Sequence, residues 1–114
     1  MPFISTKTNK KLTKENEIAL KEAFGKAIEL LPGKTEKWLM LSFDGECHMA
    51  FHGDMDSDMA YLTVSLVGSA SDDAYDALTK ELCNIMQEKL GIAPDMVYIK
   101  YEEIDHWGFN GFNF

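Results

Sequence analysis

The residue types that could do chemistry begin at the N-terminus, where Pro2 follows the initiator Met1 directly. Removal of Met1 would leave Pro2 with a free secondary amine, a base that no side chain provides. A general base works best when its pKa lies near the ambient pH. The alternative is that Pro2 is only a stabilising or processing residue. The rest of the chain favours the chemical role.

Anion binding in this chain depends on lysine. All eleven cationic residues are lysines, and there is no arginine. The bidentate clamp that a guanidinium forms on a carboxylate or phosphate is therefore absent. Any bound anion must be held by a lysine, a terminal amine or backbone N–H groups. The net charge of −8 argues against a nucleic-acid partner, which needs clustered cations.

The length of 114 residues predicts a single domain over residues 1–114 with one core. No run of about 18 apolar residues is present, so no membrane partner or span is expected. Lysines interrupt the first residues where a signal peptide would be apolar, so we expect a cytoplasmic protein, with any secretion by another route. Cys47 and Cys83 form no disulfide framework or CxxC motif, which predicts free thiols in a reducing compartment.

The elements that must position these groups fall into two similar halves. In the first half, a short strand at residues 3–7 precedes a helix for which Thr13 is the N-cap. Pro32 and Gly33 end that helix, and a strand over residues 38–43 follows. The near-continuous apolar character of this strand predicts burial on both of its faces.

The second half repeats the pattern after a short predicted strand at residues 48–51. A strand over residues 60–67 leads to a helix capped by Ser71 and ended by Gly91. A last strand is expected at residues 96–101. The repeat, with a period near 58 residues, predicts two β-α-β units that form one four-stranded mixed sheet in an α/β (α+β two-layer) fold.

Right-handed crossovers would place both helices on one face of this sheet. The other face would then carry aromatic and apolar residues that are unsuited to full exposure, namely Trp38, Met40, Tyr61, Tyr98 and Tyr101. We therefore expect an oligomer that covers this face. The last nine residues, 106–114, contain four aromatic residues, which predicts a small hairpin that docks on a neighbour or over a pocket.

Taken together, these features resemble the tautomerase superfamily, and most closely its macrophage migration inhibitory factor branch. The resemblance runs along the whole chain, at residues 1–2 (Met-Pro), 33–34 (Gly-Lys), 49–51 (Met-Ala-Phe), 66–68 (Leu-Val-Gly), 94–99 (Pro-Asp-Met-Val-Tyr-Ile) and 107–110 (Trp-Gly-Phe-Asn). It implies a homotrimer whose three sheets face a central channel, with active sites at subunit interfaces. The implied activity is keto–enol tautomerisation of arylpyruvates such as phenylpyruvate.

The resemblance also assigns roles to single residues. It implies that Pro2 is the general base and that Lys34 binds the substrate carboxylate, whereas alone Lys34 would be taken for a solvated loop lysine. An apolar pocket and a nearby Lys⁺ would both lower the pKa of the amine. The implied pocket walls are Val67, Trp38, Phe109, Phe114 and, from across an interface, Tyr98. Plain packing remains an equally good explanation of the aromatic residues.

Two departures from the family pattern affect what is expected. Lys100 stands where the family often has Asn, and it could favour acidic or phenolic substrates or could point away from the pocket. Tyr61 and Val64 replace the CxxC pair of the animal cytokine, so thiol-oxidoreductase activity is not implied.

His48 and His52 lack a third ligand nearby, so no metal site and no cofactor are expected.

Three functions remain open at this point. The first is an arylpyruvate tautomerase, an intramolecular oxidoreductase. The second is a cytokine-like signalling or host-modulating homologue that binds a receptor and keeps residual tautomerase activity. The third is a related dehalogenase or decarboxylase, which the absence of arginine disfavours because those relatives hold carboxylates with arginines. The first two use the same residues, so the sequence does not separate them.

Overall fold

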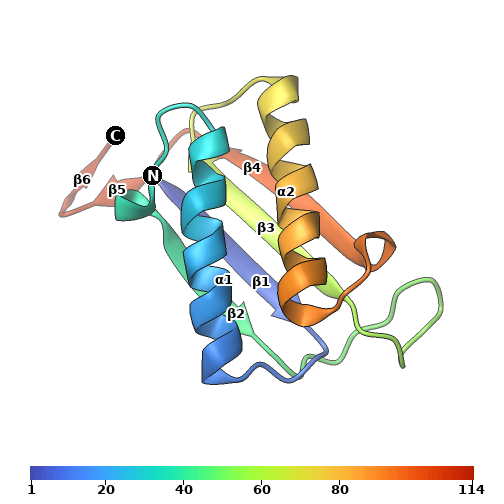
Figure 1. Ribbon diagram of the computed structural model, residues 1–114. Helices are drawn as coiled ribbons and strands as arrows, with labels where there is room; N and C mark the ends of the chain where they lie inside the picture. Colours follow the sequence, from blue (N-terminus) through green and yellow to red (C-terminus); the bar gives the residue numbers. More distant parts are fainter.

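The computed structural model describes all 114 residues and has two layers. One layer is a sheet with the strand order β2–β1–β3–β4, formed by β1 (Pro2–Thr8), β2 (Met40–Asp44), β3 (Ala60–Val67) and β4 (Val97–Ile104). Helices α1 (Lys14–Ala27) and α2 (Asp72–Leu90) form the other layer on one face of that sheet (Figure 1). Within each half the two strands are parallel, whereas β1 and β3 are antiparallel. The predicted pair of β-α-β units in one mixed sheet is confirmed.

Short elements complete the chain. They are the 3₁₀ turns η1 (Ile28–Leu30), η2 (Glu36–Trp38) and η3 (Pro94–Met96), and the hairpin strands β5 (Gly108–Phe109) and β6 (Phe112–Asn113). No helix combines the length and the apolar character that crossing a bilayer requires.

Both helices begin at their predicted caps and α2 ends where predicted, whereas α1 ends at Ala27 and the 3₁₀ turn η1 occupies the residues that were expected to extend it towards Pro32. Thr13 accepts a hydrogen bond from the backbone N–H of Asn16 (3.1 Å), and the Asn16 side chain accepts one from the N–H of Thr13 (3.0 Å), which makes a capping box for α1. The Ser71 hydroxyl accepts the N–H of Ala74 (3.1 Å) at the start of α2. Gly91 ends α2 with a φ of 69°, a left-handed conformation that glycine adopts without steric cost.

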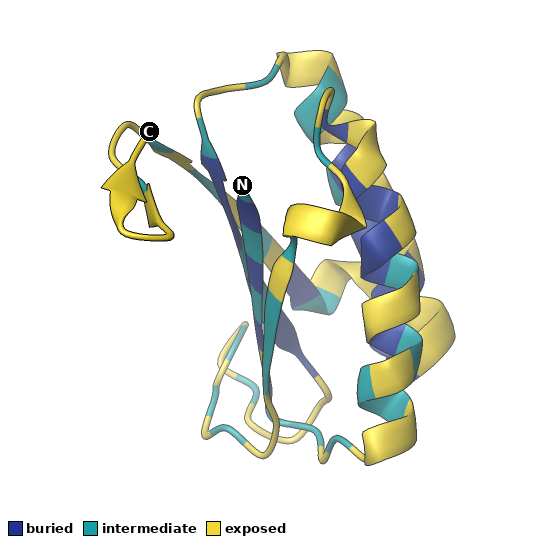
Figure 2. Cartoon of the chain, turned by 90° about the vertical axis from the view of Figure 1, so that its left-hand side faces the viewer, coloured by how far each residue is buried: buried dark blue, intermediate teal, exposed yellow.

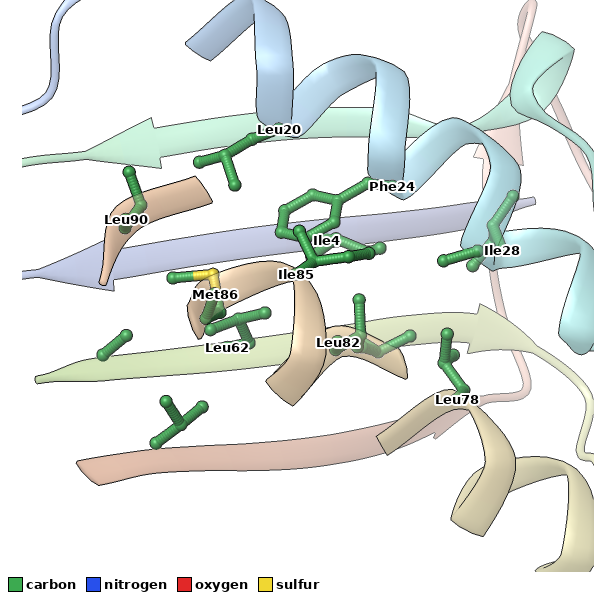
Figure 3. Packing of buried hydrophobic residues seen from close by; sticks show 14 of the residues in the cluster. Ile4, Leu20, Phe24, Ile28, Leu62, Leu78, Leu82, Ile85, Met86 and Leu90 are labelled. Carbon is green, nitrogen blue, oxygen red and sulfur yellow. The ribbon is translucent and has the colours of Figure 1, made fainter. Parts of the chain in front are cut away.

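The core shows the internal repeat directly. Each half carries a row of apolar side chains that faces the sheet. All of these side chains are fully buried: Leu20, Phe24 and Ile28 in the first half, Leu78, Leu82 and Met86 in the second. They pack around Ile4 and Leu62, which stand at the centre of β1 and β3 (Figure 3). Each half alone would leave one row uncovered, so the two units stabilise each other.

Two predictions about the strands are wrong. Residues 38–43 were expected to form a strand buried on both faces, but β2 starts at Met40, and it is an edge strand on which only Leu41 and Phe43 pack against the core. Residues 48–51 were expected to form a strand but hold a single bridge between Phe51 and Asp54 within a turn. His52 directly after Phe51 has a φ of 56°, and this left-handed conformation interrupts a strand.

The face of the sheet away from the helices is more polar than the sequence suggested. Successive strand residues point to opposite faces, so the register aligns a row of polar residues across all four strands of this bare face, namely Ser42, Ser5, Thr63 and Lys100. Tyr101, which was expected on the bare face, points to the helices instead, where its hydroxyl lies 2.7 Å from that of Thr79. Figure 2 shows the buried residues concentrated on the helix side.

Two neighbouring threonines of β1 generate a prediction about stability. The Thr6 hydroxyl is fully buried and has no hydrogen-bond partner, whereas the equally buried Thr8 hydroxyl donates to the Met59 carbonyl at 2.7 Å. A buried polar group without a partner costs free energy. We expect Thr6→Val to raise the free energy of unfolding by about 1 kcal/mol, and Thr8→Val to lower it by about 1–2 kcal/mol.

Urea unfolding at one fixed protein concentration measures both variants, and each serves as the control for the other. Loss of stability in Thr6→Val would show that its hydroxyl has a partner in solution.

Candidate active site

The N-terminus is held inside the sheet and does not project from it. β1 lies between β2 and β3, and the buried Pro2 pairs with Leu66 near the end of β3. The backbone N–H of Val67 donates to the carbonyl of Met1 at 3.3 Å. Pairing on both sides of β1 therefore fixes the position of the first residues.

Lys34 reaches the same point from the loop after α1. Gly33 turns the chain with a φ of 79°, and the N–H of Lys34 donates to the Leu31 carbonyl at 3.0 Å. The Lys34 ammonium group donates a hydrogen bond to the carbonyl oxygen of Val67 at 3.2 Å. The structure thus brings together the chain start, Lys34 and Val67, three features that the sequence predicted to be near one another.

The terminal amine, which Met1 carries in this structure, has a shifted pKa. Burial lowers the pKa of this amine below its ordinary value, and the charge of Lys34 and a hydrogen bond with Lys34 lower it further. Removal of Met1 would transfer the terminal amine to Pro2, which is more buried than Met1. Pro2 pairs with Leu66, the residue before Val67, whose carbonyl accepts the Lys34 hydrogen bond.

Two pockets flank this amine. The first has a volume of about 320 Å³ and is lined by Met1, Lys34, Trp38, Val67 and Phe114. The second has a volume of about 720 Å³ and is lined mainly by apolar residues, among them Pro2, Phe3, Trp107 and Phe109, together with Lys37. Met1 and Trp38 line both pockets, so they form the wall between them.

The C-terminal hairpin forms one side of these pockets. Its two-residue turn, Asn110 and Gly111, has positive φ at both positions (53° and 84°), as a tight hairpin turn requires. Phe109 contacts Trp38 edge-to-face, with 5.4 Å between the ring centroids. The hairpin predicted from the aromatic C-terminus is confirmed, and it lies over the pockets of its own chain beside the N-terminus (Figure 1).

Tyr98 and Lys100 do not join this group within one chain. Tyr98 lies opposite Tyr61, towards the end of the sheet remote from Pro2, and its ring is 4.5 Å from that of Phe51. The Lys100 ammonium group is 3.5 Å from the Glu102 carboxylate and 5.7 Å from the centre of the Tyr61 ring. Its hydrogen bond with Tyr61 raises the pKa of Lys100 and lowers the pKa of Tyr61.

Several residues of the second pocket were not predicted from the sequence. Phe3, Lys37, Met40 and Trp107 line this pocket, although none was singled out as a site residue. The spacing of Lys37 and Trp38 from Lys34 was a usable signal, because a short helical turn after Gly33 brings all three to one end of the sheet.

The whole chain, residues 1–114, matches the family model described as macrophage migration inhibitory factor (MIF). No curated protein matches. Solved structures with the same fold include MIF2 of Leishmania major, with 26% identity, coverage of 100% of this chain and 97% of that chain, and a TM-score of 0.93. The macrophage migration inhibitory factor homologue of Prochlorococcus marinus has 28% identity, coverage of 98% of both chains and a TM-score of 0.88.

A third structure, Pt0534 inactivated by 2-oxo-3-pentynoate, has 16% identity, coverage of 97% of this chain and 95% of that chain, and a TM-score of 0.82, so it is similar in fold. The family model spans every element described above, from the strand that starts at Pro2 to the C-terminal hairpin. The chain therefore belongs to the macrophage migration inhibitory factor family of the tautomerase superfamily.

Proposed function

We propose that the protein catalyses the keto–enol tautomerisation of arylpyruvates such as phenylpyruvate, with the amine of Pro2 as general base after removal of Met1. The observation that carries this proposal is the position of the chain start beside two largely apolar pockets, where burial and Lys34 lower the pKa of the terminal amine that Met1 carries in this structure. An amine with a lowered pKa is more often in its free-base form at neutral pH, which is the form that accepts a proton.

Lys34 is suited to hold the acid end of such a substrate. An ammonium group has three N–H donors, and one of them is directed at the Val67 carbonyl. Another forms the hydrogen bond with the Met1 amine, so one donor remains for the carboxylate or the adjacent ketone oxygen of a 2-oxo acid. The hydrogen bond to Val67 fixes the direction of this donor before the substrate arrives, which lowers the entropic cost of binding.

The reaction moves one proton and leaves the oxidation state of the substrate as a whole unchanged. The Pro2 amine takes a proton from the carbon between the ring and the ketone, and the electrons of that C–H bond form the C=C bond of an enolate. The positive charge of Lys34 stabilises the negative oxygen that develops. Return of the proton from Pro2 to this oxygen gives the enol, and the base is regenerated.

The relationship to Pt0534 supplies a chemical probe. That protein is inactivated by 2-oxo-3-pentynoate, a 2-oxo acid with an alkyne conjugated to its ketone. A nucleophile adds readily to such an alkyne, and a secondary amine with a lowered pKa is a strong candidate for this addition. The same reagent therefore tests whether the first residue of this chain is a reactive amine.

The first prediction of this proposal concerns Pro2. Pro2→Ala lowers kcat/KM for phenylpyruvate by about 100-fold or more, the usual scale for loss of acid–base catalysis. Intact mass of the purified wild-type protein shows loss of Met1, and 2-oxo-3-pentynoate adds one molecule at the N-terminal residue. Normal turnover by Pro2→Ala, or wild-type protein that is active with Met1 retained, contradicts the assignment.

The second prediction concerns Lys34, with Lys7→Gln at the far end of β1 as a matched charge control. Lys34→Gln raises KM about 10-fold or more, because it removes a charged hydrogen bond to the carboxylate. Lys34 lowers the pKa of the terminal amine, so its loss raises that pKa and keeps the base protonated up to a higher pH, which moves the acidic limb of the pH–rate profile to higher pH. An unchanged KM and pH profile would remove Lys34 from the site.

We also propose that the active unit is a homotrimer with sites shared between chains. Tyr98 and Lys100 lie away from the pockets of their own chain, on the bare face and at the β4 edge of the sheet. They can therefore contribute to a site only if a neighbouring chain presents it.

If the protein is a trimer, light scattering should give a mass about three times the chain mass of 12.9 kDa.

Tyr98→Ala alone should lower kcat/KM about 10-fold, as expected for loss of a substrate-contacting ring. A mixing experiment then tests whether the site is shared between chains. Pro2→Ala and Tyr98→Ala chains are unfolded together, refolded and assayed. Mixed trimers contain some sites with an intact Pro2 from one chain and an intact Tyr98 from its neighbour, so activity rises above that of both parents. A mixture no more active than its better parent would place each site within one chain.

A further inference from the structure

The wall between the two pockets places a lysine on each side of the terminal amine. Lys34 lines the pocket of about 320 Å³, and Lys37 lines the pocket of about 720 Å³. Met1 and Trp38 separate the two spaces, since both residues line both pockets. Removal of Met1 would eliminate half of this wall, and the two pockets would then join beside the amine of Pro2.

The Trp38 ring holds Lys37 at the edge of this joined space. The Lys37 ammonium group lies 5.2 Å from the centre of the Trp38 ring, within the range of a cation–π interaction. Phe109 contacts the same ring from the hairpin at 5.4 Å. An aromatic substrate in the second pocket would therefore have the Trp38 and Phe109 rings and the Lys37 cation beside it.

The charge of Lys37 is not neutralised by a carboxylate. The ion pairs of the chain join Lys10 to Asp58, Lys21 to Glu36 and Lys100 to Glu102. Lys37 belongs to none of them, although 19 of the 114 residues are acidic. Lys100, the second cation suggested by the sequence, is paired with Glu102 and lies outside the pockets of its own chain. Among the residues that line the second pocket, Lys37 has the one cationic side chain, and its charge is available to a second anion.

Lys37 also differs from Lys34 in its relation to the base. The causes that lower the pKa of the terminal amine are burial and Lys34, and Lys37 is not among them. Lys37 lines the second pocket and not the pocket of Lys34, so a role for Lys37 concerns binding in the second pocket. In a protein with a net charge of −8, preference for a doubly charged anion requires a local cation of this kind.

We propose that Lys37 determines substrate specificity, selecting 2-oxo acids that carry a second anionic group at the far end of an aromatic ring. This inference rests on the proposed function, because it assigns the 2-oxo carboxylate to Lys34. The ring occupies the second pocket between Trp38 and the hairpin, and the distal anion meets Lys37. The substrate class is a dianionic arylpyruvate, such as one with a carboxylate on its ring.

Binding of two unreactive probes tests this inference. The probes are 3-phenylpropanoate and 3-(4-carboxyphenyl)propanoate, which have the three-carbon acid of phenylpyruvate but no ketone, so they cannot tautomerise. Calorimetry or NMR titration of the processed wild-type protein should show about fivefold tighter binding of the dicarboxylate, the scale of a partly exposed ion pair. This preference should decrease as salt is added.

Four variants identify the cation. Lys37→Gln should bind both probes equally, Lys37→Arg should retain the preference, and Lys7→Gln, at the far end of β1, should retain it as the matched charge control. Lys100→Gln tests whether Lys100 of a neighbouring chain supplies the cation instead. Equal binding of the two probes by the wild type, or a preference that survives Lys37→Gln, overturns the inference. Loss of the preference in Lys100→Gln alone would assign the role to Lys100 and would also overturn it.

Kinetics separates this inference from the proposed function. If 4-carboxyphenylpyruvate and phenylpyruvate are both turned over, Lys37→Gln should raise KM for the dicarboxylate alone, with the kcat and the pH profile unchanged. A change of the pH profile would mean that Lys37 acts on the base, which contradicts a binding role. If the wild type turns over neither compound, the proposed function fails, while the binding of the two unreactive probes still decides the role of Lys37.

Discussion

Placement of β1 in the interior of the sheet is the constraint on which the site depends. A chain terminus at the edge of a domain frays, because its backbone groups have few partners. Here β1 is paired with β3 from Pro2 and with β2 from Phe3, so backbone hydrogen bonds hold the first residues in place. The antiparallel register with β3 also fixes what lies beside the amine, because the end of β3 brings Val67 and its carbonyl to Met1. Lys34 reaches the amine by bonding to that same carbonyl.

The fold was predictable from the sequence because its signals are local and occur twice. Helical spacing of apolar residues, the caps at Thr13 and Ser71, and the left-handed Gly33 and Gly91 are each decided by residues close in the chain. The repeat then implied two like units, and the handedness of crossovers placed both helices on one face. The C-terminal hairpin was predictable for the same reason, since the Asn110 and Gly111 turn is a local signal.

Features decided by pairing between distant segments were not predictable. The apolar run before and within β2 is typical of a buried strand. Its burial depends on the order of the strands in the sheet, however, and β2 is an edge strand. Tyr101 was expected on the bare face, yet register alone decides which face a strand residue occupies. The same limit applies to the site. Lys34 and Val67 were found through the resemblance, whereas Lys37 enters only because η2 turns it towards the space between β1 and the hairpin.

The polar row across the bare face bears on how chains could associate. Ser42, Ser5, Thr63 and Lys100 cross the middle of the sheet, and Glu102 accepts a hydrogen bond from Ser65 (2.9 Å) and pairs with Lys100 on the same face. Covering this row with an apolar partner would leave hydroxyls and charges without hydrogen bonds, at a cost of about 1–3 kcal/mol for each group. Exposed aromatic residues lie instead towards the ends and edges, as at Tyr98 and the hairpin. Subunits could meet through the ends and edges of their sheets and keep the middle of each sheet in contact with water. Such contacts would bury the aromatic rings and leave the polar row solvated.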